Sequence, residues 1–239
     1  MAVKTLEQGN IYFFYRPKKG EEKPDRVEEI QRFYVVLQPQ TGPTRLIVIG
    51  RKLMPDVERR KERTWGFVDA VRDNPEAIED ALDRPDESPV RPAGEGVYQL
   101  VSHDGRHAHL VYALELPEQP GEVQRELRVE KEASYILSVK NPQQPSPRGM
   151  GLEPEREAHY TPQIMERFGN RRFIPAEPEL LNYEGAELVF IGAAEDVGKE
   201  LGIELPTEHE TPDTAEIFRE LKLEKDRHPV EPLLRGRWK

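Results

Sequence analysis

The chain of 239 residues contains no cysteine, so it forms neither disulfides nor thiolate metal sites and has no cysteine nucleophile. It also has no apolar run near the roughly 18 residues that a membrane-spanning helix needs. The first ten residues lack the charged-then-apolar pattern of a secretory signal. Together these absences predict a cytoplasmic protein with no membrane partner.

Positive charge is also scarce, with 35 Lys and Arg against 45 Asp and Glu and a formal net charge of −10. Nucleic-acid binding depends on Lys and Arg side chains that neutralise phosphates, so this balance argues against a nucleic-acid partner. Apolar residues make up 36% of the chain and charged residues 33%, which is typical of a globular protein with a heavily charged surface. The length is sufficient for one large domain.

The most informative stretch runs from Gly94 to Leu116. Two runs rich in β-branched and aromatic residues flank Asp104-Gly105, the dipeptide favoured in a two-residue type I′ turn because both residues tolerate positive φ. The pattern predicts a central β-hairpin. Centring the turn on Asp104-Gly105 places Ser102 opposite His107.

Further strands are predicted where β-prone residues cluster, over 11–15, 32–37, 45–50, 133–139 and 187–192. Trp65, Phe67 and Val68 are expected to return the chain to the core after a charged run. The helical patterns are short, as in 77–82, 123–127 and 195–201. The expected fold class is therefore α+β, a mostly antiparallel twisted sheet or partly open β-barrel of about seven strands with peripheral helices.

The domain prediction is one integrated domain over residues 1–239. It comprises a β-rich part over 1–142, an α+β part over 150–205 and a surface-lying tail over 206–239. The loop over 141–154 is rich in proline and contains Pro142-Gln143-Gln144-Pro145, a spacing that aromatic grooves recognise in extended form. An ordered loop between two elements explains the same composition.

The stretches GNIYFFYRP, LIVIGRK, RPAGEGVYQLV, ASYILSVKNP and RRFIPAEPELLNYEGAEL resemble a group of bacterial proteins of similar length that carries no assigned activity. This resemblance covers nearly the whole chain. It implies a single integrated domain and supplies no catalytic residue.

The hairpin also carries the first candidate site, because His107 and His109 lie two residues apart on one strand and share a face. In the predicted register Ser102 joins them on the less apolar face. Three readings remain open. The two imidazoles begin a metal site, or Ser102 and His107 form a nucleophile pair that lacks a third group, or half-exposed histidines perform no chemistry.

A second candidate is the basic pair Arg171 and Arg172, which follows a helix that ends at Gly169. Cations at a helix C-terminus interact favourably with the helix dipole and the last carbonyls, which is a sufficient structural role. Arginine also recognises carboxylates and other anions through two parallel hydrogen bonds, so an anion-binding role is the alternative.

No catalytic triad, metal-binding motif or phosphate-binding loop is complete in this sequence. Gly192–Lys199 resembles a phosphate-binding loop, but its glycines are one residue too far apart. The sequence therefore predicts a non-catalytic cytoplasmic binding or scaffold module with no cofactor, and it leaves open whether the protein is an enzyme. Its partner would be an unidentified small molecule or protein, bound through Ser102, His107, His109, Arg171 and Arg172. The alternative is a metal-dependent hydrolase or isomerase that uses His107 and His109.

Overall fold

The computed structural model describes residues 3–59, 62–211 and 214–238, and most of this chain is antiparallel β-structure. The strands are β1 (Val3–Pro17), β2 (Ile30–Pro39), β3 (Thr44–Ile49), β4 (Arg63–Arg72), β5 (Arg91–His103), β6 (His107–Leu116), β7 (Glu132–Lys140), β8 (Phe173–Pro175) and β9 (Glu187–Ala194).

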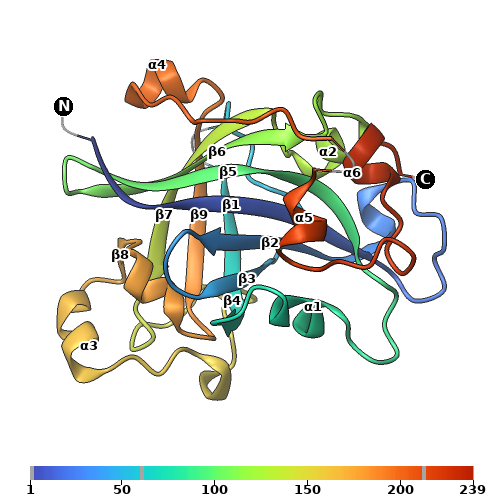
Figure 1. The fold of residues 1–239 in the computed structure, drawn as a ribbon. Coiled ribbons are helices and arrows are strands. Elements are labelled where there is room, and N and C mark those ends of the chain that lie inside the picture. Colours follow the sequence, from blue (N-terminus) through green and yellow to red (C-terminus); the bar gives the residue numbers. More distant parts are fainter. Residues whose placement is uncertain (1–2, 60–61, 212–213, 239) are drawn as a thin grey trace.

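Eight strands close into a barrel in the order β1-β2-β3-β4-β9-β7-β6-β5, with β5 pairing back onto β1 (Figure 1). The mostly antiparallel prediction is confirmed, and the expected twisted sheet or partly open barrel of about seven strands is in the structure a closed barrel of eight strands with few helices. The segment around Trp65, predicted only to re-enter the core, belongs to β4, whose pairing with β9 closes the barrel. The short β8 adds to the end of β7.

Large side chains that alternate along the strands fill the barrel interior. Phe13 lies 5.1 Å from Tyr112 between ring centroids, and Tyr112 lies 6.2 Å from Tyr135. All three rings are completely buried. Because successive residues of a strand point to opposite sides, the outward-facing residues are free to carry other functions.

A buried polar cluster lies in the barrel near the short helix η3 (Pro178–Asn182). The guanidinium of Arg45 donates to both carboxylate oxygens of Glu7, at 2.6 and 2.8 Å, and to Oδ1 of Asn182. The hydroxyl of Tyr98 donates to the same carboxylate. The side chain of Arg45 is only 1% exposed, so this charge is stabilised by its partners and not by water.

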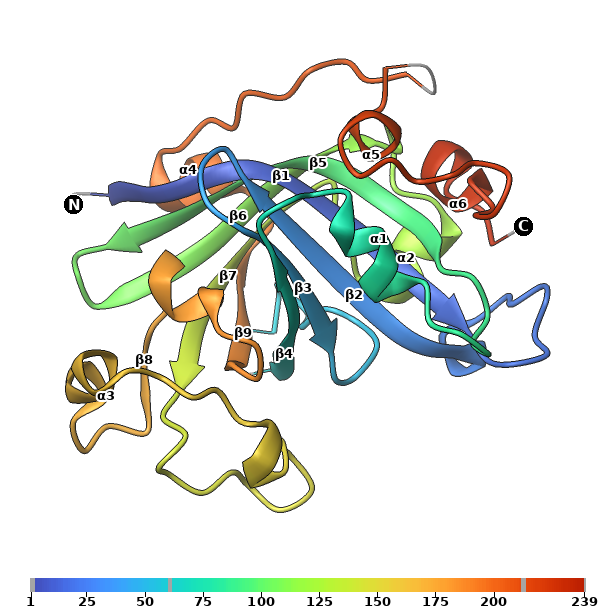
Figure 2. The ribbon, with the colours of Figure 1, turned by 60° about the horizontal axis from the view of Figure 1, so that its bottom comes forward.

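A second apolar cluster lies on the outer face of β1, β2 and β3 and is covered by α1 (Ala77–Leu82), α5 (Glu216–Arg219) and α6 (Glu231–Arg235). Both views show α5 and α6 beside the C-terminus, well away from α3 (Pro162–Phe168) and β8 (Figures 1 and 2). The remaining helices are η1 (Val27–Glu29), α2 (Glu122–Leu127), η2 (Pro154–Arg156) and α4 (Val197–Leu201).

The part of the chain after residue 150 both completes the barrel and covers it. Strand β9 lies between β4 and β7, and Ile217, Leu221 and Leu233 pack against the outer face of the first three strands. Within the described residues, none of the helices has the length and apolar character to cross a membrane.

Candidate functional site

The hairpin of β5 and β6 forms as predicted, but the predicted pairing of its two strands is wrong by one residue. Asp104 and Gly105 both have positive φ, at 52° and 65°, as the turn prediction requires. The connection includes Arg106 as a third residue, so His103 pairs with His107 and Ser102 pairs with Ala108. Because strand side chains alternate, this one-residue change exchanges the two faces of β5.

The register change separates Ser102 from the histidines. Ser102 and Ala108 both contribute to a groove of about 510 Å³ that Lys4 and Arg171 also line. His107 and His109 lie on the opposite, outer face of the hairpin with His103. The predicted Ser102–His107 pair is therefore wrong.

The three outward histidines differ in burial, because His107 is exposed, His103 is half-buried and His109 is packed against protein. His109 is 4% exposed, and its Nδ1 lies 3.0 Å from Oγ of Ser134. Burial lowers the pKa of His109 to about 4, with smaller contributions in the same direction from His103 and His107. At neutral pH this imidazole is uncharged.

Arg171 has the helix-terminal role that the sequence offered as sufficient. Its Nε donates to the carbonyl of Phe168 and its Nη2 to the carbonyl of Arg167, in the last turn of α3. The neighbouring Arg172 points elsewhere. Its Nη2 donates to the carbonyl of Pro145 at 2.6 Å, and its guanidinium lies 5.9 Å from the centroid of the Phe173 ring.

Arg172 belongs to a groove of about 530 Å³ on the outer face of β4, β9 and β7, which we call the outer groove. Its lining combines apolar and aromatic side chains with three arginines. The lining residues are Arg51, Glu62, Arg63, Trp65, Ser138, Pro147, Met150, Arg172, Phe173, Val189 and Ile191.

Two planar rings form the aromatic part of the outer groove. Trp65 of β4 and Phe173 of β8 meet edge to face, with centroids 6.1 Å apart. Trp65 pairs with Val189 in the sheet, so both side chains project from the outer surface of the barrel. Met150 is 41% exposed and is the only large hydrophobic side chain with such exposure among the described residues. Trp65 is only 8% exposed, so the uncovered apolar surface of the groove comes mainly from Met150 and the half-buried Phe173.

Positive charge in the outer groove is poorly neutralised. Among the described residues, Arg63 and Arg172 have no carboxylate within ion-pair distance, and Arg51 reaches Glu62 only at 3.9 Å. The Glu62 carboxylate is bound more closely by Arg128, at 2.7 Å. The protein has a net charge of −10, so a groove lined by three arginines and one glutamate beside aromatic rings has the opposite sign of charge to the chain as a whole.

The proline-rich loop supplies one wall of the outer groove through Pro147 and Met150. Glu187 holds this loop in place, since its carboxylate accepts hydrogen bonds from Oγ of Ser146 and from the backbone N–H of Leu152. Lys140, completely buried, neutralises Glu187 at 3.1 Å. The loop is thus an ordered wall, and the groove exists before any ligand arrives.

A larger cavity of about 930 Å³ lies near the C-terminus, but its charges balance. Its lining combines four arginines with four acidic side chains: Arg26, Arg125, Arg235, Arg237, Asp25, Glu122, Glu126 and Glu231. Such a surface attracts neither sign of charge strongly. The outer groove is smaller but chemically more selective.

Comparisons with known proteins supply no further guide to the site, because no family model, curated protein or solved structure matches this chain. The resemblance to a bacterial group without assigned activity stays a prediction.

Sequence reasoning found Arg172 but missed the other residues of the outer groove. Arg51, Trp65 and Phe173 lie far apart in sequence and meet only because β4 and β8 occupy neighbouring parts of the barrel surface. The local signal was present in Arg63-Thr64-Trp65, where the alternation of a strand places Arg63 and Trp65 on one face. The sequence does not reveal that β4 pairs with β9, so it gave no indication of which residues lie beside that face.

Proposed function

We propose that the protein is a non-catalytic binding module whose outer groove takes a small anionic molecule carrying an aromatic ring. The observation that carries this proposal is the pair of unneutralised guanidinium groups, Arg63 and Arg172, beside Trp65 and Phe173. The cavity volume of about 530 Å³ lies within the range typical of small-molecule sites.

Each part of this ligand has a matching part of the groove. A phosphate or carboxylate would accept charge-assisted hydrogen bonds from Arg63 and Arg172. A planar ring would pack against Trp65 and Phe173, which favour stacked or edge-to-face contacts. Arg172 is already held by the carbonyl of Pro145, so little side-chain entropy is lost when it binds the anion.

The polar groups of the outer groove favour binding over catalysis. Its lining includes one hydroxyl, Ser138, and one carboxylate, Glu62. The described lining residues include no histidine that could activate Ser138, and Glu62 is held by Arg128. A nucleophile needs a base within hydrogen-bond reach, which this lining does not provide. The cytoplasmic location stays a prediction.

The experiment is a calorimetric titration with a panel that separates the parts of the ligand. The panel contains adenosine monophosphate, an indole carboxylate, adenosine and inorganic phosphate. We expect the first two to bind and the last two, each lacking one part, to bind at least about tenfold more weakly. The stronger of the first two distinguishes a phosphate ligand from a carboxylate ligand.

A matched pair of variants tests whether the ligand binds in the outer groove. Arg172→Gln should lower the affinity by about 10- to 100-fold, because it removes a hydrogen bond to a charged group. Arg171→Gln makes the same change of charge at the adjacent position, outside the outer groove, and should retain the affinity of the unaltered chain. An equal loss in both variants, or a loss confined to Arg171→Gln, would contradict the proposal.

The alternative of a metal-dependent hydrolase or isomerase on His107 and His109 gains no support from the geometry. Within the described part of the chain, no carboxylate or third histidine brings a ligand atom close enough to these two imidazoles to complete a set of three. The Nδ1 of His109 is also engaged with Ser134.

A further inference from the structure

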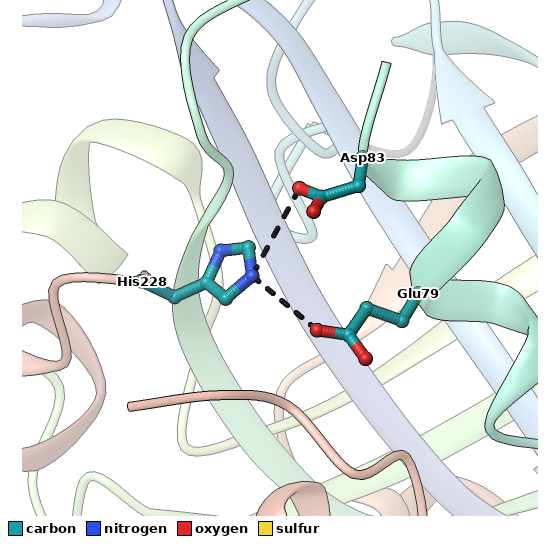
Figure 3. Close-up of side chains that lie close together, drawn as sticks. All are labelled: Glu79, Asp83 and His228. Carbon is teal, nitrogen blue, oxygen red and sulfur yellow. Dashed lines mark ion pairs between the residues drawn. The ribbon is translucent and has the colours of Figure 1, made fainter. Parts of the chain in front are cut away.

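A second, separate group of polar side chains lies where the C-terminal segment crosses α1. Figure 3 shows Glu79 and Asp83 of the α1 region pointing toward the ring of His228. Glu79 and Asp83 are four residues apart, so they project from one side of the helix. Their carboxylate oxygens and the ring nitrogen all lie within 4.8 Å of one another.

The proton on His228 can be placed from its contacts. Its Nδ1 lies 2.9 Å from the carbonyl oxygen of Val90, which only accepts hydrogen bonds, so Nδ1 carries the proton. The opposite nitrogen, Nε2, is buried and has no hydrogen-bond partner among the residues that the structure describes. It points between Oε1 of Glu79, 3.7 Å away, and Oδ1 of Asp83, 4.0 Å away.

These distances fit a bound cation better than a direct ion pair. A protonated ring nitrogen bonded to a carboxylate would lie about 2.8 Å from its oxygen. In a tetrahedral zinc site, ligands about 2.1 Å from the metal lie about 3.4 Å from one another. The distances from Nε2 to the two carboxylate oxygens, 3.7 and 4.0 Å, are slightly longer than that value, so a small inward movement of the side chains would complete the site.

The surroundings also resemble the support that metal ligands require. A ligating histidine commonly donates its other ring nitrogen to a backbone carbonyl, as His228 does to Val90. Arg227 donates to the second oxygen of Asp83 and orients that carboxylate. Among the described residues, the buried Oε1 of Glu79 has no hydrogen-bond partner, and a bound cation would compensate that cost.

We propose that Glu79, Asp83 and His228 bind one divalent transition-metal ion of the Zn²⁺ type. Two carboxylates and a neutral imidazole balance its charge. They supply three of four tetrahedral ligands, and water from the partly exposed side supplies the fourth. Because Glu79 and Asp83 come from α1 and its C-terminal end and His228 from the segment after α5, the metal ties the C-terminal segment to the barrel.

The test is calorimetric titration of chelator-treated protein with Zn²⁺, followed by thermal unfolding. We expect one equivalent to bind, and the unfolding temperature to rise by roughly 5–10 °C at a hundredfold excess over Kd. Glu79→Gln and Asp83→Asn should each lower the affinity by at least about 100-fold, since removal of a ligand costs more than removal of its support. Arg227→Gln should lower it about tenfold.

Two control variants locate the metal. Asp80→Asn changes an exposed carboxylate of α1 that is outside the group of three and should leave Zn²⁺ binding unchanged. The double variant His107→Gln, His109→Gln should also leave it unchanged. Absence of saturable binding by the unaltered chain, or binding that survives both Glu79→Gln and Asp83→Asn, would overturn the proposal. Loss of binding in the His107, His109 variant would place the ion on the hairpin instead.

Discussion

In the barrel interior, the buried charges of Arg45 and Glu7 compensate each other. Arg45 is 1% exposed and Glu7 is 7% exposed by side chain, so neither charge has water as a substitute for the other. Breaking one partner of a buried pair leaves an uncompensated charge, which costs more than replacing both.

Glu7→Gln should therefore lower the free energy of unfolding by about 3–5 kcal/mol, measured by urea denaturation. The double variant Glu7→Gln, Arg45→Met should lose less than the single variant, because the orphaned guanidinium is gone. A double variant as unstable as the sum of its two single variants would mean that the pair is not coupled.

Gly96 is constrained by the close approach of β5 and β6. A Cβ at this position would lie 2.1 Å from the carbonyl oxygen of Ala113, and backbone cannot move aside as a flexible side chain can. Gly96→Ala should therefore destabilise the protein by about 1–3 kcal/mol. At Gly198 a Cβ meets nothing closer than 3.5 Å, so Gly198→Ala in α4 should be neutral or stabilising by up to about 1 kcal/mol. Thermal unfolding of both variants tests this contrast, and an equal loss would contradict it.

The C-terminal segment is attached to the barrel through a buried carboxylate. Glu95 accepts hydrogen bonds from the backbone N–H groups of Glu216 and Ile217, at 2.7 and 2.9 Å. Burial nevertheless raises its pKa to about 8, and the charges of Glu210 and Glu216 act in the same direction. Burial likewise raises the pKa of Glu115, in this case to about 7.

These raised pKa values predict that stability falls as the pH rises. Between the ordinary carboxyl pKa of 4.5 and about 8, the folded chain binds more protons at Glu95 than the unfolded chain, so raising the pH favours unfolding. His109, with its lowered pKa, gives the opposite slope below pH 6.5.

We therefore expect the free energy of unfolding to decrease from pH 6.5 to 8.5. Glu95→Gln should reduce that slope in urea denaturation at constant ionic strength, and an unchanged slope in this variant would contradict the assignment.

The loop wall of the outer groove depends on Lys140, which binds both Glu157 at 2.9 Å and Glu187 at 3.1 Å. Lys140→Met leaves the Glu187 carboxylate buried without its cation. We expect faster amide hydrogen exchange over 143–157 and a weaker affinity for the groove ligand, although Lys140 does not line the groove. Unchanged exchange in that loop would show that Lys140 does not hold the wall.

At the scale of an element, the hairpin shows that a local sequence pattern can predict a turn without predicting the strand register. Asp104-Gly105 correctly predicted the turn and its positive φ values, because those depend on two residues alone. The register depended on whether Arg106 belongs to the loop or to the strand, and the turn dipeptide does not contain that information. In the structure, Leu110 and Tyr112 of β6 share the core face with Leu100 and Tyr98 of β5, whereas a turn centred on Asp104-Gly105 would place the two pairs on opposite faces.

At the scale of the whole molecule, strand positions were predictable but barrel closure was not. Most strands are visible as local runs of β-prone residues, such as 32–37 and 187–192. Closure depends on β4 pairing with β9 more than 100 residues later, and no local pattern fixes such a partner. The outer groove was missed for the same reason, since Trp65 and Phe173 become neighbours only once that closure is made.

The most direct test of the proposed function observes the two indole N–H signals of the chain by ¹H–¹⁵N correlation NMR during titration with adenosine monophosphate or the indole carboxylate. Only Trp65 and Trp238 give such signals, and Trp65→Phe assigns them. Trp65 is 8% exposed and lines the outer groove, and Trp238 is 4% exposed and lines the charge-balanced cavity, so the two rings report on different places. We predict a saturable shift of the Trp65 signal with Trp238 unmoved, and loss of that shift in Arg172→Gln. A ligand that binds while the Trp65 signal stays in place would contradict the assignment of the outer groove as the binding site.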